Sequence, residues 1–80
     1  MEANPLFLKN PVIKCKCNIK ELRIAKGWKQ SDLARETGFT SNFINMIEHE
    51  KVYPILETRI KIARALETDT SAVWVVQKNE

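Results

Sequence analysis

The pattern of apolar and polar positions along the chain predicts a set of short helices. Segments in which apolar residues recur at three- and four-residue steps alternate with residue types that start or end helices. The predicted helices cover residues 19–26, 30–37, 41–50, 55–66 and 71–74. Short amphipathic helices bury their apolar sides against one another, so the pattern predicts an all-α domain.

Capping residues and glycines set the predicted helix boundaries. Asn18 and Glu21 have the spacing of a capping box at the start of the first helix. Gly27 and Gly38 are expected in the left-handed conformation that ends the first and second helices, and Thr40 is expected to cap the third. Only a tight turn therefore separates the second predicted helix from the third.

The same periodicity predicts which side of each helix is buried. Leu33 and Ala34 are expected on the inner side of the second helix, and Ile44 and Ile47 on the inner side of the third. In the fourth helix the expected core stripe consists of Leu56, Ile60, Ala63 and Leu66. These positions together predict one shared hydrophobic core.

A period of two near the beginning of the chain predicts a strand. Ile13, Cys15 and Cys17 alternate with polar residues, and we expect residues 12–17 to pair with residues 73–77. One alternative continues a helix through Trp74, and another pairs the beginning of the chain with its copy in a dimer. Residues 1–11 contain two prolines and no period, which predicts a mobile or loosely docked N-terminal arm before a domain of residues 12–80.

Length and charge allow one small domain. The 80 residues carry 13 Lys and Arg against 10 Asp and Glu, a net charge of +3 that is compatible with a polyanionic partner without requiring one. No segment approaches the roughly 20 apolar residues of a membrane span, and no signal sequence is recognised, so a cytoplasmic protein without a membrane partner is expected.

Two cysteines and a single histidine are the only residues that suggest metal or redox chemistry. Cys15 and Cys17 are spaced too closely on a strand for an unstrained disulfide, so reduced thiols are expected. With His49 they make only three potential metal ligands, and free thiols are the better interpretation. No motif for catalysis is present, so the sequence predicts neither an enzyme nor a cofactor.

The outer side of the third helix has an unusual composition. At roughly 100° per residue, less than half of the helix circumference holds a group of uncharged or weakly charged side chains, Ser41, Asn42, Asn45, Met46 and His49. Amides, a hydroxyl and a thioether reach base edges in a DNA major groove without desolvating a charge, and either asparagine would bridge the two major-groove atoms of adenine. The alternative is an ordinary polar helix face.

From residue 18 to about residue 74 the chain resembles the helix-turn-helix family of phage repressors, Cro proteins and Xre-type regulators. The matching residues are Ile19 to Arg23, Gly27, Trp28, Gln30 to Ala34, Gly38, Ile44, Ile47, Glu48, Lys51, Pro54 and Ile62 to Leu66. The resemblance implies five helices around one core and a homodimer that binds double-stranded DNA through the third helix. It also implies a cytoplasmic, nucleoid-associated protein of bacterial or phage origin.

The resemblance also assigns roles to individual residues. Base reading falls to Ser41, Asn42, Asn45 and Met46. Contacts with the DNA backbone fall to Gln30, Thr40 and Lys51, and Gln30 is also expected to brace the third helix. Arg23 and Glu48 match a structural ion pair between the first and third helices, which positions the third helix more than it adds stability.

Three positions depart from the family pattern. Lys29 stands where a capping Thr, Ser or Asn is usual, so that cap is expected to be missing and the lysine to point at a DNA phosphate. Glu50 replaces the glycine that usually ends the third helix, so the helix either runs on or its turn differs. Arg59 replaces an apolar residue of the fourth helix.

The sequence thus predicts a sequence-specific DNA-binding transcriptional regulator, with repression favoured over activation. Two other functions stay open. The domain would serve as the DNA-binding antitoxin of a toxin–antitoxin pair if its arm or C-terminal residues bind a partner protein. It would serve as a protein-interaction module if the third helix has no affinity for DNA.

Overall fold

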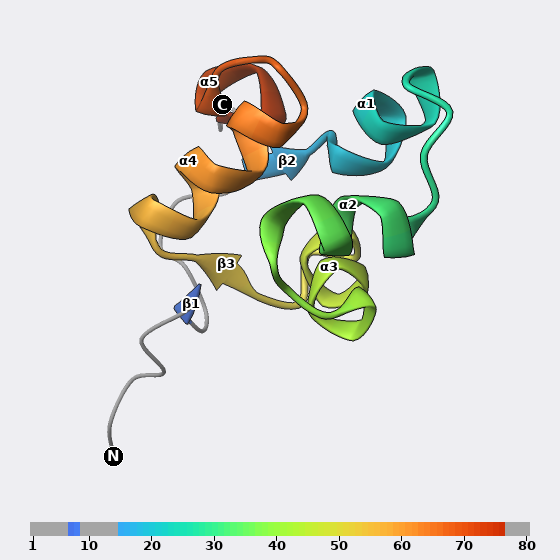
Figure 1. The fold of residues 1–80 in the computed structure, drawn as a ribbon. Coiled ribbons are helices and arrows are strands. Elements are labelled where there is room, and N and C mark those ends of the chain that lie inside the picture. Colours follow the sequence, from blue (N-terminus) through green and yellow to red (C-terminus); the bar gives the residue numbers. More distant parts are fainter. Residues whose placement is uncertain (1–6, 9–14, 77–80) are drawn as a thin grey trace.

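A computed structural model describes residues 7–8 and 15–76, which form five helices and four short strands (Figure 1). In chain order the elements are β1 (Phe7–Leu8), β2 (Cys15–Cys17), α1 (Ile19–Ala25), α2 (Gln30–Thr37), α3 (Ser41–Glu48), β3 (Tyr53–Pro54), α4 (Leu56–Ala65), α5 (Thr70–Val73) and β4 (Trp74–Val76). The predicted five-helix architecture is confirmed, and each helix begins and ends within two residues of its predicted boundaries. Over the described ranges, no helix is long and apolar enough to cross a membrane.

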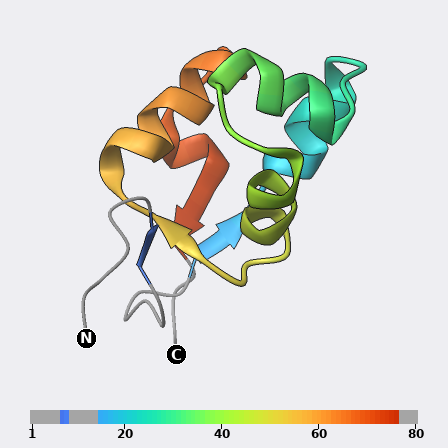
Figure 2. The same ribbon diagram turned by 60° about the horizontal axis from the view of Figure 1, so that its bottom comes forward.

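Two strands that are far apart in the sequence pair as predicted. β2 runs antiparallel to β4, with Cys15 opposite Val76 and Cys17 opposite Trp74. Figure 2 shows the two strands side by side, running in opposite directions. The alternative that continues a helix through Trp74 is wrong, because the chain turns into β4 at this residue. The pairing holds the two ends of the helical domain together.

A second strand pair was not predicted from the sequence. β1 pairs antiparallel with β3, so that Phe7 lies opposite Pro54 and Leu8 opposite Tyr53. A proline is tolerated in so short a pair because it occupies an edge. Part of the predicted arm therefore contacts the segment before α4 of the same chain. The remainder of residues 1–11 lies outside the described residues, as do residues 12–14 and 77–80.

The core lies between the five helices and β2 and β4. Its buried apolar residues are Cys17, Ile19, Leu33, Ala34, Ile44, Ile47, Ile62, Ala63, Leu66, Val73 and Trp74. The predicted inner residues of α2 and α3 are all among them, and Ile44 and Ile47 are fully buried. α2 packs against both α3 and α4, so it forms the centre of the helical arrangement.

The inner side of α4 differs from the prediction. Ala63 and Leu66 are buried as predicted, but Leu56 is 55% exposed and Ile60 is 36% exposed, and Thr58 and Ile62 face the core in their place. In this rotation Arg59 Nε donates a hydrogen bond to Pro54 O at 2.9 Å and the Arg59 guanidinium stacks on the ring of Tyr53. The arginine that departs from the family pattern therefore anchors the first turn of α4 to β3.

The predicted capping box at the start of α1 is absent. The Asn18 side chain makes no capping hydrogen bond and instead donates through Nδ2 to Ala72 O at 3.3 Å. Its backbone N–H donates to Val73 O at 2.7 Å. Asn18 lies where β2 leaves its pairing with β4, so its polar groups join α1 to α5 rather than satisfying the first turn of α1.

Candidate nucleic-acid interface

The turn between α2 and α3 has the predicted chemistry. Gly38 ends α2 with φ +82°, a left-handed conformation that a residue with a Cβ adopts at a cost. Thr40 Oγ1 accepts a hydrogen bond from the backbone N–H of Phe43 at 3.0 Å, so Thr40 caps α3. This turn sets the two helices against each other and exposes the first turn of α3.

The exposed side of α3 contains the residues that were expected to read bases. Ile44 and Ile47 face the core with no exposed surface, while Ser41 and Asn42 are exposed and Asn45 and Met46 are half-buried. This side bears no lysine, arginine or carboxylate. The predicted division of α3 into an inner and an outer side is therefore confirmed.

An ion pair between α1 and α3 lies behind this exposed side. Arg23 Nε and Nη2 both donate to the Glu48 carboxylate, the second at 3.1 Å to Oε1, and Nη1 donates to Trp28 O at 3.0 Å. The Glu48 side chain is only 2% exposed. Arg23 and Glu48 thus form the ion pair that the resemblance implied, and the pair also holds the loop after α1.

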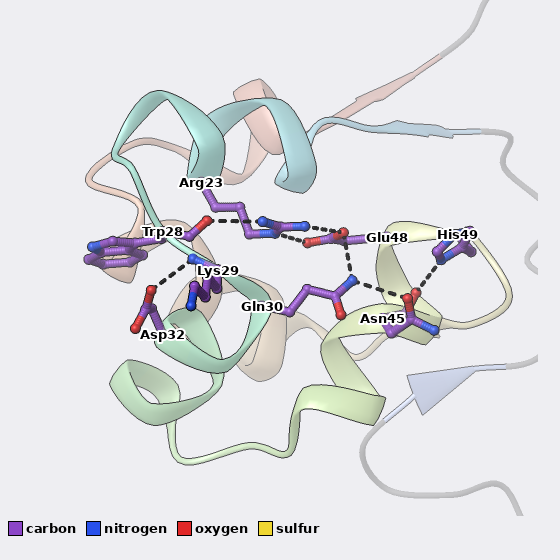
Figure 3. A network of polar contacts seen from close by, with 8 residues as sticks. All are labelled: Arg23, Trp28, Lys29, Gln30, Asp32, Asn45, Glu48 and His49. Atoms are coloured by element: carbon purple, nitrogen blue, oxygen red, sulfur yellow. Dashed lines mark hydrogen bonds and ion pairs between the residues drawn. The ribbon is translucent and has the colours of Figure 1, made fainter.

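Gln30, the first residue of α2, connects the ion pair to the exposed side of α3 (Figure 3). Its Nε2 donates to Asn45 Oδ1 at 3.1 Å and to Glu48 Oε1 at 3.0 Å. Both hydrogens of the Gln30 amide are directed at α3 in this arrangement. Gln30 therefore braces α3, and a contact with a phosphate would need another donor at the start of α2.

The contact between Gln30 and Glu48 was missed in the sequence. A signal for it was present, because Asn45 and Glu48 are three residues apart and are neighbours on the surface of a helix. A side chain that braces Asn45 from α2 therefore also reaches Glu48. The structure shows that the side-chain amide of Gln30 donates to both residues.

The start of α2 lacks a side-chain cap, as the lysine at position 29 predicted. The Lys29 side chain makes no capping hydrogen bond, but the backbone N–H of Lys29 donates to Asp32 Oδ2 at 2.8 Å. This hydrogen bond, with help from Arg35, lowers the pKa of the half-buried Asp32 carboxyl. The Lys29 side chain itself is exposed.

The remaining candidate backbone contacts lie at the two ends of α3. Thr40 and Lys51 are both exposed, and the backbone N–H of Lys51 donates to Met46 O at 2.9 Å, which places it directly after the last turn. A helix of eight residues is about 12 Å long, close to the width of a major groove. The two residues are thus placed at opposite ends of a groove-sized element.

The C-terminal end of α3 turns without a glycine. The helix stops at Glu48 instead of continuing to residue 50, and Glu50 adopts the left-handed conformation with φ +59°. Its carboxylate Oε2 accepts a hydrogen bond from the backbone N–H of Cys17 at 2.9 Å. His49 caps the helix, and its Nδ1 lies 2.9 Å from Asn45 O. A contact with β2 therefore accompanies the unfavourable backbone conformation of Glu50.

Both cysteines are free thiols. Cys15 is half-buried and Cys17 is buried in the core. Burial raises the pKa of Cys17 to about 12, so this thiol stays protonated at neutral pH. In the part of the chain that the structure describes, no group of three or more His, Cys, Asp or Glu residues is arranged to hold a metal ion.

Comparisons with known proteins agree with this geometry. The chain is similar in structure to a hypothetical transcription factor from Neisseria, with 30% sequence identity and a TM-score of 0.63. The similarity covers 66% of this chain and 60% of that protein, so the chain spans less than two thirds of the Neisseria chain. Among curated protein sequences, none matches.

The family comparison covers most of the chain. A sequence profile described as a helix-turn-helix domain matches residues 18–80. The matched region includes all five helices and the polar network of Figure 3. The chain belongs to the helix-turn-helix domain family.

Proposed function

We propose that this domain binds double-stranded DNA sequence-specifically through α3 and regulates transcription as a repressor. The observation that carries the proposal is the uncharged polar side of α3, which is exposed while the opposite side is fully buried. The helix-turn-helix match and the resemblance to a hypothetical transcription factor support DNA-binding regulation rather than enzymatic activity.

In this proposal α3 supplies the base contacts, and residues at the start of α2 and on either side of α3 supply the backbone contacts. Base edges are read by Ser41, Asn42, Asn45 and Met46. The phosphates are contacted by Lys29, Thr40, Lys51 and the backbone amides at the start of α2, where Gln30 lies. Phosphate contacts from both ends of α3 orient the helix in the groove, and base contacts supply the specificity.

The protein acts as a homodimer in this proposal. Two copies of α3 then read two half-sites about one helical turn apart, and the bound operator has a twofold-symmetric sequence. Selection of bound duplexes from a random pool tests this arrangement. A palindromic consensus supports the dimer, whereas a consensus without symmetry contradicts it.

The base-reading role is tested by removing one exposed amide. Asn42→Ala should weaken binding to the selected site by about 1–3 kcal/mol and leave binding to random duplex nearly unchanged. Ser71→Ala, which truncates an exposed polar residue of α5, is the matched control and should change neither affinity. Equal losses on both duplexes for Asn42→Ala would contradict base reading.

A backbone contact has a different signature. Lys51→Ala should weaken binding to all duplexes alike and reduce the slope of log affinity against log salt concentration by about 1. Titrations at several salt concentrations measure this slope. If wild-type protein shows no salt-dependent binding to any duplex at low ionic strength, the domain is a protein-interaction module instead.

A further inference from the structure

The side-chain amide of Asn45 has a defined orientation. Its Oδ1 accepts the hydrogen bond from Gln30, and Figure 3 shows its nitrogen on the side away from Gln30. An amide offers an acceptor at oxygen and two donors at nitrogen, so the group that faces a base decides which base edge it recognises. The orientation of Asn45 therefore bears directly on DNA specificity.

A chain of contacts that begins at a charged pair imposes this orientation. The Glu48 carboxylate, held by Arg23, offers only acceptors to its neighbours. A half-turn of the Gln30 amide would bring its oxygen against the oxygen atoms of Glu48 and Asn45, with no hydrogen between them. Gln30 must therefore direct Nε2 at both residues, and Asn45 must direct Oδ1 at Gln30.

Burial strengthens this constraint. The Glu48 side chain is 2% exposed and that of Arg23 is 11% exposed, so water does not easily replace a lost contact. Two hydrogen-bond acceptors that face each other without a donor between them cost free energy, and the cost is greater in a buried place. Within the described residues, no group of the protein accepts a hydrogen bond from Asn45 Nδ2. Both of its N–H groups stay available to a ligand.

On the basis of the proposed DNA-binding role of α3, we propose that Arg23, Glu48 and Gln30 set Asn45 as a hydrogen-bond donor that recognises guanine. Guanine presents two acceptors, N7 and O6, in the major groove, whereas an amide that recognises adenine must also turn its oxygen toward N6. Cytosine presents a donor there and is disfavoured. Glu48 and Gln30 are positioning residues for this specificity. Recognition of guanine by Asn45 replaces the earlier expectation that Asn45 bridges the two major-groove atoms of adenine.

Duplex selection with wild-type protein and Asn45→Asp tests the contact itself. The base whose preference changes between the two proteins is the one that residue 45 contacts. Wild-type protein should prefer guanine over adenine there by roughly tenfold. Asn45→Asp should prefer cytosine, because a carboxylate accepts from its N4 amino group. A wild-type preference for adenine at that base overturns the inference and leaves the proposed function intact, while loss of binding to every duplex overturns both.

The positioning role is tested with Glu48→Gln. A glutamine at position 48 offers a donor, so the Gln30 amide is free to reverse and the preference for guanine over adenine should narrow to about twofold. Glu36→Gln, which removes the same charge from the exposed surface of α2, is the matched control and should keep the wild-type preference. An unchanged preference in folded Glu48→Gln overturns the positioning role.

A measurement on the wild-type protein without DNA remains decisive if Glu48→Gln does not fold. Side-chain amide signals in nuclear magnetic resonance spectra report hydrogen exchange for each amide. The Gln30 Nε2 hydrogens should be protected, and the Asn45 Nδ2 hydrogens should exchange much faster than those of Gln30. Protected hydrogens on Asn45 together with rapid exchange on Gln30 overturn the proposed orientation.

Discussion

α3 and α4 are both short helices with apolar residues at helical spacing. α3 turns its expected side inward, whereas α4 buries only Ala63 and Leu66 of its four expected core residues. α3 buries Ile44 and Ile47, as its periodicity predicts. α4 buries Thr58 and leaves Leu56 and Ile60 exposed. The two helices belong to the same small core, so the difference must come from how each is held in place.

Two physical factors account for the difference. Ile44 and Ile47 lie on the same side of α3 and polar residues occupy the opposite side, so only one rotation buries both isoleucines. The hydrogen bond from Gln30 to Glu48 supports that rotation. α4 has apolar residues on most of its circumference, so several rotations bury comparable apolar area. Contacts of its first turn with β3 then select one of them. Apolar periodicity determines the rotation of a helix only where it leaves one choice.

The largest expected difference between the two helices concerns their arginine anchors. Arg23→Ala should lower the free energy of unfolding by about 3–5 kcal/mol, because it leaves the buried Glu48 carboxylate without its partner. Arg59→Ala should cost about 1 kcal/mol, since it removes one hydrogen bond to a carbonyl and one stacking contact. Urea unfolding of both variants measures the difference. Similar losses would show that the two anchors are equivalent.

Core truncation gives the next largest contrast. Ile47→Ala should cost about 2–5 kcal/mol because it opens a cavity in a fully buried site. Leu56→Ala should change the free energy of unfolding by less than about 0.5 kcal/mol, since Leu56 is 55% exposed. Thermal and urea denaturation report both values. A large loss for Leu56→Ala would restore the core stripe that the sequence predicted for α4.

The pH dependence of stability tests the strand that supports the end of α3. Burial raises the pKa of Cys17 from an ordinary value of 9.0 to about 12 in the folded protein, so the thiol ionises first in the unfolded chain. Its contribution is complete below about pH 9 and is lost as the pH rises toward 12. Between these values wild-type protein should lose up to about 1.4 kcal/mol per pH unit more than Cys17→Ala. If the free energy of unfolding fell equally with pH in the two proteins, the Cys17 thiol would be exposed to solvent rather than buried.

The smallest expected effect compares the left-handed glutamates that follow the two helices. Glu50 and Glu67 both have φ +59°, but Glu50 accepts a hydrogen bond from β2 whereas the Glu67 side chain is 79% exposed and forms an ion pair with Lys26. Glu67→Gly should raise stability by about 1 kcal/mol by removing the conformational cost. Glu50→Gly should change it less, because the bond to Cys17 is lost. Equal gains would show that this bond contributes nothing.

Local chemistry made much of the fold predictable from the sequence. Gly38 and Thr40 define the turn between α2 and α3 through their own conformational preferences, so the turn needed no knowledge of the rest of the chain. Asn18 had equally good local chemistry but was wrongly predicted. Its polar groups form hydrogen bonds with α5, and the side-chain partner, Ala72, is 54 residues away in the sequence. The residues next to Asn18 do not indicate so distant a partner.

The candidate site shows the same division. The exposed residues of α3 follow from its periodicity, since exposure is decided by which side the isoleucines occupy. The direction of the Asn45 amide does not follow from periodicity. It depends on Gln30 and Glu48 meeting in space, and a hydrogen-bond direction of this kind appears only when the two helices are placed.

The pairing of β2 with β4 brings the points where the chain enters and leaves the helical domain next to each other. Cys15 and Val76 are direct partners across the pair. Polypeptide added before β2 and polypeptide added after β4 would therefore depart from the same side of the molecule, whatever its length.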